Sequence, residues 1–479
     1  MRPPKYILLL PYLAILIGCQ GLAPTEETRI PFLQMTIPDN WTAFAKASEQ
    51  ADQADQPDAK VAMDTGENPT GDPIPSWLDD FDDPRLQALV REAFGKNFDL
   101  EAALARVKAA RAQAKRQGAE KLPELTANSS ASRSKSAITN TTSSNLELGM
   151  NISWEIDLWN RLDNAAKAAV ADEKAQQAEY RMAKLALAAN VAKAWFDAIE
   201  SDQQLRLAEK TVRSFENSLR TIEQRYRLGI GPALDVRLTR ENVATAHSQR
   251  EIRARNRDTS VRSLEILLGG YPAASLSIQP NLPELRQAVP VGLPSDLLNR
   301  RPDIIAAQAR LLATDHRLAA ARANRLPSVR LTASGGTASH ELHNLLRADS
   351  LLWQLIGNLT QPLWDGGRLS AQVEIAAANR QQASAKYAAV ALRAFREVES
   401  ALTAEVLLAK QEAALRIATQ EANAAAVLAL DQYRQGLSDI ITLLSTQRRE
   451  FDAERSLLAV TKQRLNTRID LYLALGGGF

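Results

Sequence analysis

Few residues of this 479-residue chain have the types and spacing that catalysis needs. His340-x-x-His343 is the only histidine pair near metal-ligand spacing, but it falls in a polar segment expected to be an outward-facing loop. His247 and His316 stand singly in expected helices. The close glycine pairs mark turns and do not follow a strand as a phosphate-binding loop would. The sequence therefore disfavours an enzyme, and we expect no metal and no bound cofactor.

The group that does suggest chemistry is the thiol of Cys19, the only cysteine in the chain. Arg2 and Lys5 precede an apolar run over residues 6–17, which is too short to cross a bilayer comfortably and is placed like the core of a secretory signal. The run ends in Leu-Ile-Gly-Cys, which resembles a bacterial lipobox. In a lipobox, cleavage before the cysteine leaves a thiol for a diacylglyceryl group and an amine for a further acyl chain.

We therefore expect residues 1–18 to be a lipoprotein signal peptide and Cys19 to carry the lipid, the only covalent group anticipated. The alternative is an ordinary signal peptide with a chance cysteine. A lone cysteine excludes a disulfide framework in either case. Gln20 follows Cys19. An Asp there would favour retention in the inner membrane in lipoproteins of this type, so by resemblance Gln20 points to the outer membrane.

The segment after Cys19 is acidic and polar. Between residues 48 and 75, seven carboxylate residues stand against one lysine. We expect residues 19–76 to be an acylated tether, much of it without fixed structure. Over the whole chain the net charge is only +2, and acidic and basic residues are interleaved, which gives no case for a nucleic-acid partner.

The sequence also contains an internal duplication. Trp159 recurs as Trp364, a shift of 205, and Tyr226-Arg227-x-Gly229 recurs as Tyr433-Arg434-x-Gly436, a shift of 207. A duplication that preserves turns and helix lengths predicts two structural repeats packed side by side, which we place at residues 77–282 and 283–479.

Each repeat contains a long segment that favours a helix. Residues 161–228 and 368–435 each run for 68 residues without Gly or Pro, which corresponds to roughly 100 Å of helix. We expect long helices at about 160–228 and 368–435, with return helices at about 233–268 and 437–475. Apolar residues at alternating spacings of three and four predict a coiled-coil seam. The predicted seam residues are Leu185, Ala188, Ala192, Trp195 and Ile199 in the first repeat and Leu392, Phe395, Leu402, Val406 and Ala409 in the second.

Other segments alternate with the period of a strand that has one apolar and one polar face, most clearly from Leu146 to Trp154. We expect strands at about 124–134, 145–155, 328–338 and 353–363. Four strands cannot close a barrel alone, because two edges stay unpaired. An exported chain with such strands suggests a transmembrane barrel built from several copies, and three copies would give twelve strands and six helical hairpins.

Several motifs in the right order resemble those of one family, the outer-membrane factors of tripartite efflux pumps, or TolC-like proteins, and most of all its lipidated NodT-type branch. The resemblance runs from about Trp77 to the C-terminus, and the acidic stretch at residues 48–75 departs from it by its length. The matching pieces are Cys19, Asp83-Pro84-Arg85-Leu86-x-x-Leu89-Val90, Asn97-x-Asp99-Leu100-x-x-Ala103, Arg300-Arg301-Pro302-Asp303-Ile304, Trp364-Asp365-Gly366-Gly367-Arg368, Tyr433-x-x-Gly436 and the closing LYLALGGGF of residues 471–479.

The resemblance implies a mixed α/β membrane protein that is mainly helical. Its homotrimer would form a 12-stranded transmembrane β-barrel continued by an α-helical coiled-coil barrel that extends into the periplasm. Such a channel does no chemistry. It passes small molecules outward from an inner-membrane transporter, commonly of the resistance-nodulation-division (RND) type, through a periplasmic adaptor. Outer-membrane lipid would surround the barrel.

The resemblance also places the turns Tyr226–Asp235 and Tyr433–Thr442 at the periplasmic tip, as the gate and the adaptor contact. Their charged groups could form contacts between helices that hold the tip shut, and Asp439 could form a ring of negative charge. The alternative is that these are solvated turn residues. The candidates are Tyr226, Arg227, Gly229, Asp235, Tyr433, Arg434, Gly436 and Asp439.

Two other functions remain open on the sequence. The channel could serve a type I protein secretion system, although the lipobox and the NodT-like motifs favour small-molecule efflux. The chain could instead be a coiled-coil structural lipoprotein without a pore.

Overall fold

The computed structural model describes residue 41 and residues 75–138, 140–285, 289 and 294–477. All of them belong to one compact unit, residues 37–479. The expected signal peptide, Cys19 and nearly all of the expected tether lie outside the described residues. Trp41 is an exception, because its side chain is 3% exposed and its ring lies 6.3 Å from that of Phe395. That point of the expected tether is therefore packed against the body.

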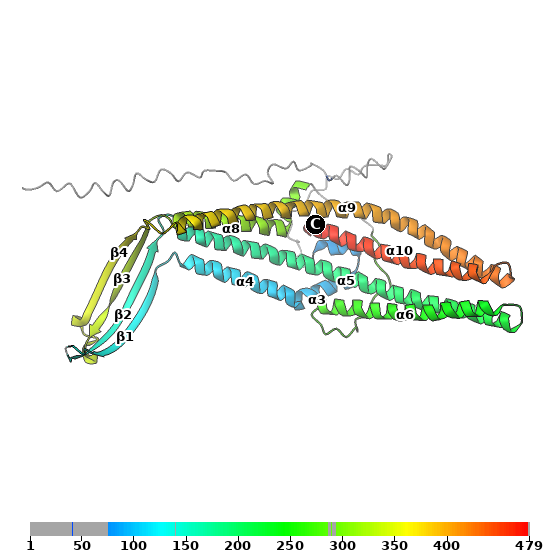
Figure 1. Cartoon of the computed structure of the whole chain (residues 1–479), viewed down its shortest axis with the longest axis horizontal. Coiled ribbons are helices and arrows are strands. Elements are labelled where there is room, and N and C mark those ends of the chain that lie inside the picture. The colour runs from blue at the N-terminus through cyan, green and yellow to red at the C-terminus, as the bar shows by residue number, and fades with distance from the viewer. Residues whose placement is uncertain (1–40, 42–74, 139, 286–288, 290–293, 478–479) are drawn as a thin grey trace, which may run out of the picture. The chain divides into compact units, whose positions relative to one another are not determined.

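Helices make up most of the described chain, and they form two matched sets (Figure 1). The first set is α3 (Pro84–Lys96), α4 (Phe98–Ala119), α5 (Arg161–Arg227) and α6 (Ala233–Leu267), and the second is α7 (Leu297–Arg300), α8 (Pro302–Ala323), α9 (Arg368–Gln435) and α10 (Ile440–Ala474). α4 and α8 both contain 22 residues, α6 and α10 both contain 35, and α5 and α9 contain 67 and 68. Short 3-10 helices occupy Ser76–Phe81, Pro294–Asp296, Leu342–Asn344 and Ala348–Ser350.

Glycine sets where the long helices end. Gly229 after α5 and Gly436 after α9 adopt φ of +75° and +78°, which a residue with a side chain seldom takes. Each glycine N–H donates to the carbonyl three residues back, and the following N–H donates to the carbonyl five residues back. This is the Schellman arrangement, which satisfies the last helical carbonyls. Gly269 and Gly476 end α6 and α10 in the same way.

Three expected boundaries were wrong by about three residues. β2 begins at Thr142 and not near residue 145. α10 begins at Ile440 and not near residue 437, because Asp439 caps it: its carboxylate accepts a hydrogen bond from the Thr442 N–H at 2.6 Å. β4 ends at Thr360 and not near residue 363. The reason is Pro362, which has no N–H to donate to a neighbouring strand.

The strands form a single four-stranded antiparallel sheet in the order β1-β2-β3-β4. They are β1 (Glu124–Lys135), β2 (Thr142–Ile156), β3 (Ser328–Ser339) and β4 (Leu351–Thr360). β2 and β3 come from different repeats and pair with Ile152 opposite Ala333, so the two repeats join within the sheet. β1 and β4 are the edges of this sheet.

The strand register collects apolar residues on one face. Directly opposed residues share a face, so Leu125, Ile152, Ala333 and Leu355 lie in one row across all four strands. The same face carries Leu148, Met150, Trp154, Leu331, Leu351, Trp353 and Leu359, whereas the other carries mainly Ser, Thr, Asn and Gln. Most of these apolar side chains are exposed in the single chain, Trp353 by 80%, whereas Trp154, Leu331 and Ala333 are half-buried. No helix among the described residues combines the length and apolar character needed to cross a bilayer.

The largest buried cluster lies where α3, α5 and α10 meet. Trp195 is fully buried, and its indole N–H donates to the Asp83 carboxylate at 2.8 Å. The same carboxylate caps α3 by accepting from the Arg85 and Leu86 N–H groups. The Trp77 ring stacks on Tyr472 at 5.6 Å, which attaches the 3-10 helix to α10.

The predicted seam was right at four of its five positions in the first repeat, where Leu185 is only half-buried, and it was only partly right in the second. Ala188, Ala192, Trp195 and Ile199 are completely buried. In the second repeat Leu392 is 47% exposed, and Ala391, Ala394 and Val398 are buried instead. The large residue faces outward because the small alanines let the neighbouring helices approach closely.

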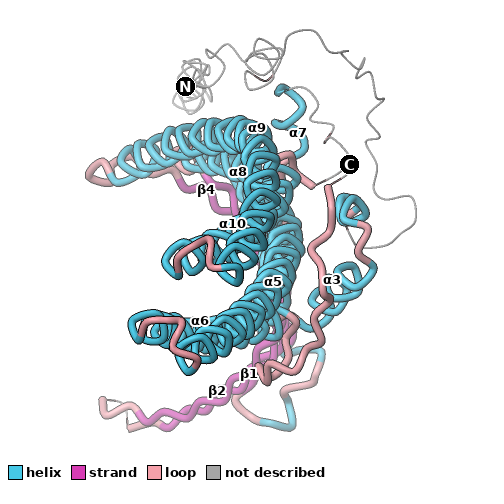
Figure 2. Tube along the Cα trace, turned by 90° about the vertical axis from the view of Figure 1, so that its right-hand side faces the viewer, coloured by secondary structure: helices cyan, strands magenta, loops and turns pink. Residues whose placement is uncertain are grey.

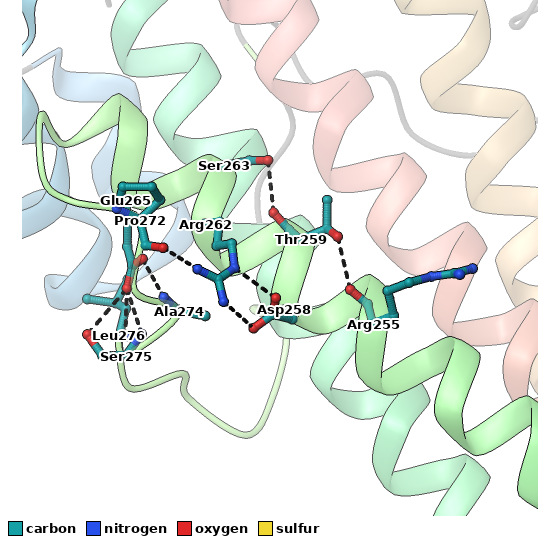
Figure 3. Close-up of polar contacts among 10 residues, drawn as sticks. All are labelled: Arg255, Asp258, Thr259, Arg262, Ser263, Glu265, Pro272, Ala274, Ser275 and Leu276. Carbon is teal, nitrogen blue, oxygen red and sulfur yellow. Dashed lines mark hydrogen bonds and ion pairs between the residues drawn. The ribbon is translucent and has the colours of Figure 1, made fainter.

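The segment after α6, which connects the repeats, is held against that helix by hydrogen bonds (Figure 3). The Glu265 side chain is 7% exposed, and its carboxylate accepts from the backbone N–H groups of Ala274, Ser275 and Leu276 at 2.7, 2.7 and 3.1 Å. Ala274 has φ +56°, an uncommon conformation for a residue with a side chain. Arg262 pairs with Asp258 and also donates to the Pro272 carbonyl.

We expect Glu265→Gln to lower the free energy of unfolding by about 2 kcal/mol, because an amide cannot accept all three N–H groups as well as a carboxylate does. These backbone hydrogen bonds outweigh burial and hold the pKa of Glu265 below its ordinary value. A carboxyl group whose pKa is lower in the folded than in the unfolded chain stabilises the fold at pH values above its unfolded-state pKa. This contribution is lost as the pH falls through the folded-state pKa.

Thermal unfolding of the full-length protein in detergent, followed from neutral to acidic pH, tests this prediction. The exposed Glu251, on the same helix, supplies the control Glu251→Gln. Equal losses of stability in the two variants would show that the Glu265 contacts do not hold the connecting segment.

Candidate functional site

The α5–α6 and α9–α10 turns lie at the end of the helical hairpins away from the strands (Figure 1). Figure 2 looks along the helices and shows α6 and α10 on the same side of α5. Both turns have the glycine-terminated geometry described above. The two hairpins are therefore equivalent in backbone, and the differences between them lie in the side chains.

Tyr433, near the end of α9, connects the two hairpins. Its side chain is 5% exposed and belongs to a buried cluster with Val236 of α6 and Leu443 of α10. Its hydroxyl donates to the Asp235 carboxylate of α6 at 3.4 Å. Tyr433 was a predicted site residue, and the structure brings it together with Asp235.

Arg225, on the last turn of α5, makes the second connection. Its guanidinium lies 5.2 Å from the centre of the Tyr433 ring. One of its nitrogens lies 3.4 Å from the carbonyl oxygens of both Tyr433 and Arg434, at the C-terminal end of α9. A cation there also complements the helix dipole. We call Arg225, Asp235 and Tyr433 the tip cluster.

The other predicted residues take different positions. Arg227 makes no contact between helices among the described residues and approaches only Glu223 of its own helix, at 3.9 Å. Tyr226 is 50% exposed. Arg434 contributes its backbone carbonyl, and Asp439 caps α10. Within the single chain, Asp235 makes one of the expected interhelical contacts, whereas the side chains of Arg227 and Asp439 make none among the described residues.

Sequence reasoning missed Arg225. One signal could have found it: the shift of 207 pairs Arg225 with Gln432, so the copies differ at this position. The predicted motif began one residue later, at Tyr226, and therefore excluded the arginine that crosses between the hairpins.

The histidine pair considered above lies in the connection between β3 and β4. His340 Nδ1 lies 2.6 Å from the Ser144 carbonyl oxygen, and His343 approaches Glu341 at 3.4 Å in an exposed position. These contacts do not bring the two imidazoles to a common ligand position.

Comparison with known proteins identifies the family. The model of a family described as outer membrane efflux protein matches residues 89–270 and 293–477. The chain belongs to this family. Outer membrane protein OprJ of Pseudomonas aeruginosa is 32% identical over 488 residues, spanning 100% of this chain and 97% of that protein. Toluene efflux pump outer membrane protein TtgF of Pseudomonas putida is 33% identical over 410 residues, spanning 84% and 85%.

Solved structures share the fold. A membrane protein from Pseudomonas aeruginosa has a TM-score of 0.80 at 32% identity and covers 89% of this chain and 99% of its own. The open state of the MtrE outer membrane channel of Neisseria gonorrhoeae has a TM-score of 0.75 at 30% identity and covers 82% and 89%. This outer membrane efflux protein is accordingly an outer-membrane channel and not an enzyme.

The two aspartates at the tip have opposite electrostatic environments. Burial raises the pKa of Asp235, and nearby Asp439 adds to this, while the Tyr433 hydroxyl and Arg225 oppose it. The Thr442 N–H lowers the pKa of Asp439. Burial, with the Asp235 charge, raises the pKa of Tyr433, so its hydroxyl keeps its proton and remains a donor at neutral pH.

We expect Asp235→Asn and Asp439→Asn to change the pH dependence of stability in opposite directions. Because the pKa of Asp235 is higher in the folded than in the unfolded chain, this group favours folding most at pH values below its unfolded-state pKa. That contribution to stability is lost as the pH rises through the folded-state pKa. The lowered pKa of Asp439 gives a contribution that is present above the unfolded pKa and lost as pH falls. Melting of both variants and wild type from acidic to neutral pH measures this, and slopes of the same sign would refute it.

Proposed function

We propose that three copies of this chain form one continuous efflux channel. In this assembly twelve strands close a barrel in the outer membrane, and the helices form a coiled-coil barrel through the periplasm. The observation that carries the proposal is the sheet, whose apolar face is exposed and whose edges β1 and β4 are open. Backbone N–H and C=O groups cannot remain unpaired in lipid, so only closure removes both problems.

The strand directions are compatible with closure by copies of the same chain. Because neighbours alternate in direction, β4 of one copy can pair antiparallel with β1 of the next. Two copies would supply eight strands, and the interior of such a barrel is just filled by its own side chains. Three copies give a wider barrel with room for a channel, with the apolar face toward lipid.

The channel serves a tripartite pump for small molecules, with a periplasmic adaptor and an inner-membrane transporter of the RND type as partners. The names of the relatives support this assignment: TtgF is an outer membrane protein of a toluene efflux pump, and OprJ is an outer membrane protein. The adaptor contacts the hairpin tips, which are the part of the helices farthest from the strands. The channel itself provides a passive path.

The tip cluster holds the channel closed. Arg225 and Asp235 belong to the first hairpin, and both contact Tyr433 of the second. Opening requires one hairpin to move relative to the other, which breaks these contacts, and the adaptor favours this by competing for the same groups. The gate thus has two discrete packings of the hairpins, one closed and one open, like an iris.

We expect Tyr433→Phe, which removes only the hydroxyl, to raise the ratio of open to closed channels in planar bilayers roughly fivefold, because a hydrogen bond contributes about 1 kcal/mol. Arg225→Gln should act in the same direction. Asp235→Ala should have a larger effect than Asp439→Ala, because Asp439 makes no hydrogen bond or ion pair with the other hairpin among the described residues.

The control is Tyr226→Phe, which changes an exposed tyrosine in the same turn region. A heat-modifiable trimer on detergent gels must be present in every variant. Absence of a trimer and of conductance in wild type would refute the channel assembly. A Tyr433→Phe trimer that conducts no better than the wild-type trimer would refute only the gate.

We also propose that Cys19 carries a diacylglyceryl group and an N-linked acyl chain that hold the mature chain at the outer membrane. The lipobox-like Leu-Ile-Gly-Cys and the absence of any other cysteine from the sequence support this. Radiolabelled palmitate should enter the wild type and not Cys19→Ser. The matched control is Gln20→Asn, which changes the neighbouring residue and should keep the label. Label retained in Cys19→Ser would refute lipidation at this position.

A further inference from the structure

A cavity of about 250 Å³ lies between α5, α6 and α10, on the strand side of the tip cluster. In Figure 1, α5 lies between α10 and α6. The walls of the cavity therefore come from both hairpins, with α5 and α6 from the first and α10 from the second. None of the contacts assigned to the gate lies inside it.

The lining combines an aromatic floor with three arginines and one carboxylate residue, Asp452. Phe215 of α5 and Phe451 of α10 meet edge to face at 5.9 Å and are 4% and 7% exposed. Arg253 of α6 and Arg448 of α10 also line the cavity, and within the described part of the chain neither forms an ion pair. Arg455 is different, because it pairs with Asp452 at 2.6 Å.

We propose that this cavity binds a small aromatic anion, such as an aromatic carboxylate or sulfonate. The volume is close to the lower end of small-molecule sites and suits one fused ring system. The aromatic floor would take the ring, and the two unpaired guanidiniums would take the acid group, because guanidinium matches the planar geometry of oxyanions. A volume of about 250 Å³ suits a small molecule better than a protein segment.

Occupancy of this cavity would hold the channel closed. Phe215 and Phe451 belong to the same buried cluster as Tyr433, so the cavity wall and the gate are packed together. A ligand bound between α6 and α10 would contact both hairpins and favour the packing in which they lie together. This effect rests on the proposed gate, whereas binding itself does not.

The test is calorimetric titration of the full-length protein in detergent with 2-naphthalenesulfonate, at one fixed micelle concentration. The uncharged 2-naphthalenesulfonamide has nearly the same shape and serves as the matched ligand. We expect the sulfonate to bind and each of Arg253→Gln and Arg448→Gln to weaken it about tenfold, or about 1.4 kcal/mol. The controls Arg255→Gln and Arg449→Gln remove a charge from the same helices outside the cavity lining.

Equal binding of the two ligands, or equal losses in cavity and control variants, would overturn the site. Displacement of the sulfonate by an acidic helical peptide of higher affinity would overturn the assignment to a small molecule. Conductance of wild type and of the Arg253→Gln/Arg448→Gln double variant is then measured with and without the sulfonate. A lower open probability in wild type alone supports the locking effect, and binding without that change overturns the locking effect while the site stands.

Discussion

The constraint on which this structure depends is the pairing of backbone N–H and C=O groups along β1 and β4. Water can satisfy such groups at the edges of a soluble sheet, but lipid cannot. In the proposed assembly, neighbouring copies complete the sheet, so that its apolar face can lie in the membrane without unpaired edges. The same assembly would surround the large residues that α9 presents outward, such as Leu392 and Leu407.

The helical hairpins pack against one another through small residues. Ala188, Ala192, Ala391 and Ala394 are completely buried, so the helices approach closely, but each alanine buries little area. Large buried groups are concentrated where α3, α5 and α10 meet and again near the tip. Between these clusters fewer large side chains are buried, so the packing there depends more on small residues.

The duplication explains how nearly equal halves can produce an unequal tip. Both long helices end at a glycine with the same backbone geometry, because the turn sequence was copied with the rest. Arg225 and Gln432 occupy equivalent positions, and only the arginine reaches across to the other hairpin. Asp235 and Thr442 also occupy equivalent positions, and the Asp235 carboxylate accepts from Tyr433. These two differences in side chain set the contacts between the hairpins at the tip.

The sequence by itself determined the local features: helix lengths from the distribution of Gly and Pro, strand faces from alternation, and the turn glycines from the repeated motif. These depend on neighbouring residues in the chain, so they can be predicted without the fold. Two of the boundaries that were wrong, at Ile440 and Thr360, each depended on one capping or proline residue. Only the tertiary structure decided the β2–β3 register, the inward alanines of α9 and the contact of Arg225 with Tyr433. Such contacts join residues about 200 positions apart, and their geometry depends on how two hairpins pack, which no local pattern encodes.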